Sequence, residues 1–145
     1  MRVKIKLPDT PSIYQTNMTL GVADMNYGDH LGNDKVLTLA HECRLRFMQT
    51  LNMDELKFYG GKLIMVDAMV QYLGQGHRGD QITLDLWLTK CTAFGFDFYY
   101  QMNKFTDSGP IEMARIKTAQ LFFDYDKEKP VKAPEKFNQV YNREL

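Results

Sequence analysis

The densest group of chemically capable side chains lies in one polar stretch, residues 24–34. It holds three acids, two amides and one histidine, and two glycines within it permit tight turns. A carboxylate or a histidine in such a loop could accept a proton. If a helix begins directly after the loop, its free N–H groups could hold an anionic or carbonyl oxygen. We therefore predict that this polar loop carries the chemistry of the chain.

The segment after the polar loop, from Lys35 to Leu51, is predicted to be a helix. Apolar residues recur there at the spacing of a core face, at Val36, Ala40, Cys43, Phe47 and Leu51. Further apolar residues widen this face, namely Leu37, Leu39, Leu45 and Met48. We therefore expect the helix to be buried on most of its sides. Asn33 or Asp34 is expected to cap its first turn.

Five other stretches have the composition or the alternation of β-strands, namely residues 12–22, 63–72, 81–89, 94–103 and 111–125. Aromatic side chains line one face of the strand over 94–103, which must pack on a large apolar partner. The strand over 63–72 is expected to alternate, with Ile64, Val66, Ala68 and Val70 on one side and Met65, Asp67, Met69 and Gln71 on the other. No element is predicted after Lys127.

Antiparallel strands joined by short turns, with one apolar helix after the first strand, predict the α+β class. We expect a five-stranded sheet wrapped around one long central helix, with the polar loop at one mouth. At this length a single domain, residues 1–145, is expected. Eighteen basic and eighteen acidic residues give no net charge, which disfavours nucleic acid or a membrane surface as partner.

The sequence contains no apolar run long enough to span a membrane, so a cytoplasmic location is expected. Cys43 and Cys91 lack the spacing of a metal site and are interpreted as reduced core residues. We therefore predict no metal site.

The order of these features resembles a known family. A first strand leads into Asp24-Met25-Asn26, a helix follows with Glu-Cys-Arg-Leu-Arg-Phe over 42–47, and four strands come after it, with a glycine-rich turn ending at Gly79. This order resembles the hotdog-fold acyl-CoA thioesterases of the 4-hydroxybenzoyl-CoA thioesterase type, over nearly the whole chain. The resemblance implies hydrolysis of an acyl-CoA thioester, with coenzyme A as part of the substrate and no other cofactor.

The resemblance also implies catalytic residues. In that family the loop reads Asp-x-Asp or Asp-x-Asn followed by Gly-His, and a carboxylate in the loop or on the helix acts as nucleophile or base. Asn26 occupies the second position, where an amide can orient a group but cannot accept its proton. Asp29 stands where glycine is expected before His30, and Glu42 lies on the helix. We predict a catalytic set of Asn26, Asp29, His30 and Glu42, with either Asp29 or Glu42 as the base.

Other residues are candidates for binding the substrate. N–H groups at Gly28, Asp29 and the start of the helix could stabilise an oxyanion, and Gly32 and Asn33 complete this part of the predicted site. Lys90 and Thr92 could meet the phosphates of coenzyme A. For several residues a plain structural role is also open: Asp29 could be a turn residue, His30 could be a packing residue, and Glu42 could pair with Arg46 four residues on.

Two other functions remain open. A non-catalytic acyl-CoA binding module is favoured by the amide of Asn26 in place of a carboxylate. A hotdog dehydratase is disfavoured, because Leu31-Gly32-Asn33-Asp34 follows the histidine where those enzymes are rich in proline.

A sheet wrapped on one helix leaves unpaired edges, so a homodimer or a dimer of dimers is expected, paired through the strand over 63–72.

Overall fold

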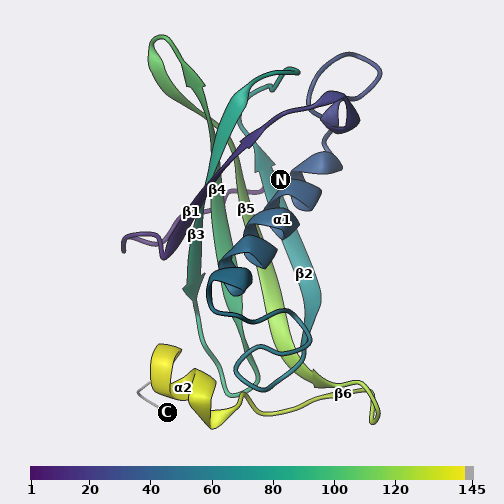
Figure 1. Ribbon diagram of the computed structural model, residues 1–145, viewed down its shortest axis with the longest axis vertical. Coiled ribbons are helices and arrows are strands. Elements are labelled where there is room, and N and C mark those ends of the chain that lie inside the picture. The colour runs from purple at the N-terminus through teal and green to yellow at the C-terminus, as the bar shows by residue number, and fades with distance from the viewer. Residues whose placement is uncertain (143–145) are drawn as a thin grey trace.

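Six antiparallel strands form one sheet in the computed structural model, which describes residues 1–142 (Figure 1). The strands are β1 Tyr14–Thr19, β2 Leu63–Tyr72, β3 Gln81–Thr89, β4 Gly95–Thr106, β5 Gly109–Asp124 and β6 Lys129–Pro130. Their order is β1-β3-β4-β5-β2, and β6 pairs with the end of β5. The bounds predicted for β2 and β3 are confirmed, while the two-residue β6 was not predicted. Strands β1 and β2 form the two edges.

Helix α1, Lys35–Thr50, lies across one face of the sheet, and the apolar layer between them is the main core (Figure 1). The helix buries Val36, Leu39, Ala40, Cys43, Phe47 and Met48 against side chains from β3, β4 and β5. This arrangement confirms the predicted α+β hotdog class. The expectation that most sides of the helix are buried is wrong within one chain, because Thr38, His41 and Glu42 are exposed.

A bulge in β2 decides which of its side chains face the helix. The pairing of β2 with β5 shifts between Met65 and Asp67, so that Val66 is an extra residue. Met65 therefore turns to the same side as Ala68, where it lines a cleft against α1. An unbroken alternation would place Met65 and Ala68 on opposite sides, so the predicted face assignment is wrong for the residues before the bulge.

A second helix closes one end of the core. Helix α2, Glu135–Tyr141, was not predicted, because charged residues and prolines dominate the sequence around it. Its Phe137 is fully buried and packs on Phe96 and Phe122.

A one-turn 3-10 helix over Val22–Asp24, also not predicted, leads into the polar loop. In the part of the chain that the structure describes, no helix is both long and apolar enough to cross a membrane.

Both cysteines are free thiols that belong to the core or its margin, as predicted. Cys43 is fully buried, and burial raises the pKa of its thiol to about 12. Burial also raises the pKa of the half-buried Cys91. Since the thiolate is the reactive form, both side chains act as apolar packing groups at neutral pH.

The face of the sheet opposite α1 is covered by residues 1–13, which we call the strap (Figure 1). Ile5 of the strap is 4% exposed and packs with Trp87 and Tyr99 in a second, smaller apolar cluster. The indole N–H of Trp87 donates to the carbonyl of Thr10 at 2.7 Å. The strap therefore converts what would be an exposed aromatic surface into a buried layer.

The strap should contribute measurably to stability. Replacing Ile5 with alanine removes its buried side chain from the second cluster, and we expect the free energy of unfolding to fall by about 2 kcal/mol. Urea denaturation followed by circular dichroism measures this change. Val3→Ala in the same strap is the control, because Val3 is 47% exposed and its loss should change stability by less than about 0.5 kcal/mol. Equal effects of the two variants would show that Ile5 does not anchor the strap.

Candidate active site

The side chain of Asn26 holds the polar loop in shape. Its Oδ1 accepts hydrogen bonds from the N–H groups of Gly28, at 2.9 Å, and His30, at 3.1 Å. The main-chain N–H of Asn26 donates to the main-chain carbonyl of His30 at 2.7 Å. The N–H of Gly28, which was predicted to bind substrate, is therefore occupied within the loop. The structure gives Asn26 a clear part in building the site.

Asp29 lies at the exposed tip of the loop, with a main-chain φ of 61°. This left-handed conformation favours glycine, and aspartate tolerates it better than most residues. The conformation explains why the resemblance leads to an expectation of glycine before His30. The N–H of Asp29 donates to the carbonyl of Asn26 at 3.1 Å. Its carboxylate accepts no hydrogen bond from any residue in the described range 1–142, so it is available to a water molecule or a substrate.

His30 joins the polar loop to the turn before β3. Its ring packs on His77, with 4.8 Å between the ring centroids, and its buried Nδ1 has no hydrogen-bond partner among the described residues. The main-chain N–H of Leu31 donates to the carbonyl of Gly76 at 2.7 Å, which ties the same two segments together. This packing role for His30 is one of the two that the sequence left open, and it does not exclude a catalytic one.

The first turn of α1 carries no side-chain cap. Asp34 is the N-cap residue but makes no capping hydrogen bond, and Asn33 Oδ1 accepts from the adjacent N–H of Asp34 at 3.0 Å. The predicted capping by these residues is therefore wrong. The N–H of Gly32 is also occupied, because it donates to the carbonyl of Asp24 at 2.9 Å. Within the first turn of α1, the N–H of Lys35 donates to the carbonyl of Gly32 at 3.0 Å. The N–H groups of Val36 and Leu37 are thus the best-placed donors for a negatively charged oxygen.

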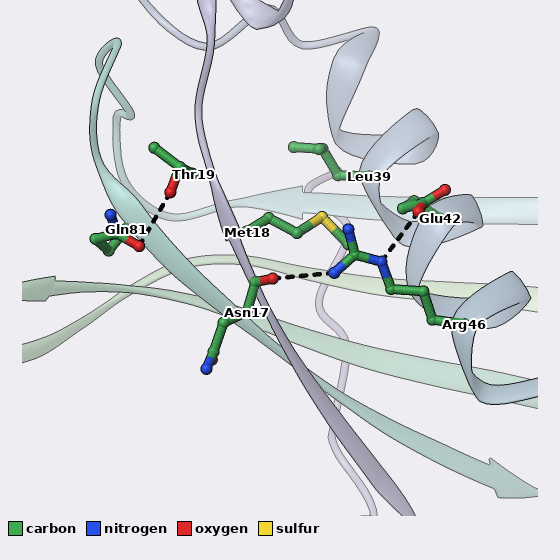
Figure 2. A pocket seen from close by; sticks show the side chains of 7 residues that line it. All are labelled: Asn17, Met18, Thr19, Leu39, Glu42, Arg46 and Gln81. Carbon is green, nitrogen blue, oxygen red and sulfur yellow. Dashed lines mark hydrogen bonds and ion pairs between the residues drawn. The ribbon is translucent and has the colours of Figure 1, made fainter. Parts of the chain in front are cut away.

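Glu42 lines a cleft between α1 and β1 (Figure 2). Eight residues separate it from Asp34, which places it roughly 12 Å further along the helix axis. Its carboxylate accepts from Arg46 Nε at 3.0 Å. Arg46 in turn donates to Thr16 Oγ1 at 2.9 Å and to the carbonyl of Asn17 at 3.0 Å, which fastens the edge strand β1 to the helix. One chain therefore does not bring Glu42 and Asp29 together.

A second cleft, of about 230 Å³, lies on the other side of α1 and faces β2. It is lined by Leu37, Thr38, His41, Arg44, Met65 and Thr118. Leu37 and Thr38 belong to the first turns of the helix, so the cleft begins beside the candidate oxyanion donors. Its walls combine the apolar Leu37 and Met65 with the polar Thr118 and His41. This cleft is the natural place for a group attached to a carbonyl carbon at the helix start.

Arg44 is the buried charge behind this cleft. It is 6% exposed, and its guanidinium donates to Glu55 at 2.8 Å and to the hydroxyl of Tyr100 at 2.9 Å. Burial alone lowers the pKa of Arg44, but Tyr100 and Glu55 outweigh this effect and hold that pKa above its usual value. Burial raises the pKa of Tyr100, whose hydroxyl also bonds Thr118 at 2.9 Å. The guanidinium therefore stays charged and the phenol stays neutral.

Sequence reasoning missed this network. The available signal was that Arg44 falls next to Cys43 on the helix face assigned to the core, where a charged side chain needs a buried partner. The partner positions in β4 and β5 are not deducible without the sheet register.

A family model described as the thioesterase-like superfamily matches residues 20–140 of the chain. The chain belongs to the thioesterase-like superfamily. This membership confirms the predicted resemblance and identifies thioester hydrolysis as the chemistry of the fold. The search of curated proteins found no match.

Solved structures with this fold agree with that assignment. A 1,4-dihydroxy-2-naphthoyl-CoA thioesterase from Synechocystis is 17% identical, with a TM-score of 0.77 over 88% of this chain and 93% of that one. A mutant of 4-hydroxybenzoyl CoA thioesterase, complexed with 4-hydroxybenzoyl CoA, is 10% identical, with a TM-score of 0.75 over 88% and 96%. A Staphylococcus aureus protein in complex with CoA is 12% identical, with a TM-score of 0.74 over 92% and 84%. Identities this low show the fold alone.

In this thioesterase-like protein, Lys90 and Thr92 lie in the turn between β3 and β4, at the end of the sheet opposite the polar loop (Figure 1). Lys90 Nζ lies 5.3 Å from the centroid of the Tyr99 ring. Thr92 Oγ1 accepts from the N–H of Gly95 at 3.1 Å, which stabilises the turn. Within one chain these two residues do not join the polar loop, and their predicted role in binding coenzyme A stays a prediction.

Gly76 sets the position of the polar loop in this thioesterase-like protein. A Cβ at this position would lie 2.6 Å from Met113 Cε, 2.9 Å from Leu20 Cδ1 and 3.1 Å from Leu31 Cβ. Gly76→Ala should therefore push Leu31 and the loop outward. We expect a loss of about 1–3 kcal/mol in stability, the usual cost of overpacking. We also expect a fall in kcat/KM towards a thioester substrate larger than the stability loss explains at a temperature where the variant is folded.

The matched control is Gly21→Ala, just before the polar loop. A Cβ there would meet only Asp24 Oδ2, at 3.8 Å, so stability and kcat/KM should stay near those of the unaltered protein. Thermal unfolding and steady-state kinetics measure both variants. A Gly76→Ala protein with unchanged kinetics would show that the loop position does not govern the site.

Proposed function

We propose that this protein hydrolyses an acyl-CoA thioester to the free acid and coenzyme A, at the junction of the polar loop and the first turn of α1. The observation that carries the proposal is that the N–H groups of Val36 and Leu37 have no side-chain cap and that the loop before them holds the partner-free carboxylate of Asp29. The first can stabilise an oxyanion and the second can accept a proton. Coenzyme A enters as part of the substrate, and the reaction needs no further cofactor or metal.

The chemistry follows from these two groups. The thioester carbonyl oxygen would lie at the first turn of α1, where negative charge developing on it is stabilised by the N–H groups and the helix dipole. A water oxygen bonds to the carbonyl carbon while the carboxylate takes the water proton. The carbon–sulfur bond then breaks, and the proton passes to the sulfur of coenzyme A. Direct attack by the carboxylate, giving an anhydride that water opens, leads to the same products.

The cleft beside β2 would receive the acyl group. Its volume of about 230 Å³ is small for a ligand cavity and suits a short acyl chain or a single ring.

We also propose a cytoplasmic location, supported by the two free thiols.

The first test of this function is turnover. Purified protein should release free coenzyme A from short-chain or aromatic acyl-CoA thioesters faster than from long-chain ones, because of the size of the cleft. A thiol-trapping reagent measures the release. Binding of these thioesters without any release above the buffer rate would support the non-catalytic binding module instead, which the amide of Asn26 favours.

The second test assigns the base. Asp29→Asn and Asp29→Gly both remove the carboxylate, and both residues tolerate the left-handed backbone, so the loop should keep its shape. We expect each to lower kcat by about 10²-fold or more, the usual contribution of general base catalysis. Glu42→Gln is the comparison, and its effect should be small because the Glu42 carboxylate is engaged with Arg46. The reverse ranking would assign the base to Glu42.

We further propose that the protein is a homodimer paired through β2, either alone or as the unit of a dimer of dimers. Strand β2 is an edge of the sheet, and its Met65, Val66 and Met69 are 46%, 52% and 39% exposed. Unpaired edges with apolar side chains promote association. Pairing two β2 edges would also cover the cleft beside Met65 with the partner chain. Each site would then be built across the interface.

Light scattering coupled to size exclusion tests this assembly. The unaltered chain should run as a multiple of its 16.9 kDa mass at low micromolar concentration. Val66→Lys places a charge at the β2 edge and should shift the population towards monomer, with activity falling in proportion. Phe105→Lys is the control, because Phe105 is 57% exposed at the far end of β4. A monomer with full activity would refute a shared site.

A further inference from the structure

A groove of about 440 Å³ lies between the start of the strap and the end of β2. The strap contributes Arg2, Val3 and Lys4, and β2 with the residue after it contributes Val70, Gln71, Tyr72 and Leu73. It is separate from the two clefts that flank α1. None of its residues belongs to the predicted catalytic or substrate-binding set.

The groove and the candidate active site are joined through Tyr72. The ring of Tyr72 lines the groove, and its hydroxyl donates to the carbonyl of Asn33 at 2.8 Å, one residue before the N-cap of α1. A molecule seated in the groove would therefore lie at the same end of β2 as the polar loop. A long, flexible ligand could reach from the groove to the first turn of the helix.

The strap is anchored at Ile5, the residue directly after Lys4. The N–H of Ile5 donates to Gln71 Oε1 at 3.0 Å, and the carbonyl of Ile5 accepts from Arg115 Nη1 at 3.0 Å. Because Ile5 is also buried, the strap is anchored directly next to Lys4. Lys4 is therefore held at the end of β2, and Arg2 lies two residues before it along the same groove.

The lining of the groove fits an adenine nucleotide better than a simple anion. Arg2 and Lys4 supply positive charge, and neither forms an ion pair within the described residues, so both are available for phosphates. Val3, Leu73 and the ring of Tyr72 supply exposed apolar and aromatic surface, at 47%, 44% and 53% exposure. A nucleobase packs well on such surface, whereas inorganic phosphate gains nothing from it.

We propose that this groove binds the 3′-phosphorylated ADP part of coenzyme A, with Arg2 and Lys4 contacting its phosphates. This inference rests on the proposed function, since it names the subsite that binds the nucleotide part of the same substrate. It replaces Lys90 and Thr92, which lie at the opposite end of the sheet within one chain, as the principal phosphate contacts. The pantetheine arm would then run past Tyr72 to the first turn of α1.

The kinetic test compares two substrates with the same acyl group. One is the coenzyme A thioester, and the other is the N-acetylcysteamine thioester, which lacks the nucleotide. In the double variant Arg2→Ala/Lys4→Ala, KM for the coenzyme A thioester should rise roughly tenfold with kcat little changed, as for the loss of two exposed charge contacts. Kinetics with the N-acetylcysteamine thioester should stay as in the unaltered protein.

A charge-matched control and a binding measurement complete the design. Lys132→Ala/Lys136→Ala removes two exposed cations, one just before α2 and one within it, and should leave both KM values unchanged. Isothermal titration with adenosine 3′,5′-bisphosphate should show binding to the unaltered protein that the double variant loses. Inorganic phosphate alone should bind neither protein at the same concentrations.

The outcomes separate the subsite from the function. If the unaltered protein hydrolyses neither thioester, the proposed function fails, and titration with adenosine 3′,5′-bisphosphate still decides the groove. If it hydrolyses the coenzyme A thioester while the double variant keeps the same KM and the same affinity for the bisphosphate, the groove is not the nucleotide site. A rise in KM for both substrates would also overturn the proposal, because it would place the effect in the active site.

Discussion

The buried guanidinium of Arg44 fixes how α1 is rotated on the sheet. A charge inside the apolar layer must keep its partners, because an unpaired buried charge costs several kcal/mol. Its partners come from two separate segments, Glu55 after the helix and Tyr100 in β4. A small rotation of the helix about its axis would break these hydrogen bonds. The side of the helix that faces each cleft, Glu42 towards β1 and His41 towards β2, is set by this one residue.

The polar loop is held mainly by main-chain hydrogen bonds, whereas the helix is oriented by a buried charged side chain. Nearly all its order comes from short hydrogen bonds to main-chain groups: the side chain of Asn26 and the carbonyl of Asp24 accept from loop N–H groups, and the carbonyl of Gly76 accepts from Leu31. These bonds occupy most of the loop donors. Among the described residues, the groups without a partner include the carboxylate of Asp29 and Nδ1 of His30, and the N–H groups of Val36 and Leu37 follow at the start of α1. A rigid scaffold that leaves a few polar groups free is what preorganised catalysis requires.

The sequence predicted the parts of the fold in which a single pattern dominates. The sequence of strand β3 alternates between aliphatic residues and mostly polar ones, and its bounds agree with the prediction. The bulge at Val66 could not be seen in the sequence. An extra residue only exchanges the two faces of the strand on one side of the bulge, and the apolar residues of β2 occur on both faces. Helix α2 was missed because its one fully buried residue, Phe137, is surrounded by charged and proline-rich sequence. The strap was missed for a similar reason, since Ile5 lies among lysines.

The polar loop remains the candidate site, but several contacts predicted within it differ in the structure. The polar loop stood out by composition, and its place before the helix followed from periodicity. Which N–H groups are free depends on main-chain geometry, and sequence gave no access to it. Asn33 and Asp34 have the right residue types for caps, yet the backbone of Asp34 is helical, and its side chain makes no cap. The pairing of Glu42 with Arg46 was visible as a four-residue spacing and is present.

The extra residue in β2 couples chain length to the wall of a binding cleft. Met65 faces the cleft only while Val66 stays outside the ladder; if Val66 paired with Gln120 instead, it would take the place of Met65 and Met65 would turn to the other face. Deletion of Met65, or insertion of one residue after Val66, would therefore exchange a flexible thioether for a stiff branched side chain in the cleft, with α1 untouched. Related chains could acquire different acyl preferences through strand length alone, and an alignment scored only by residue identity would not reveal the change.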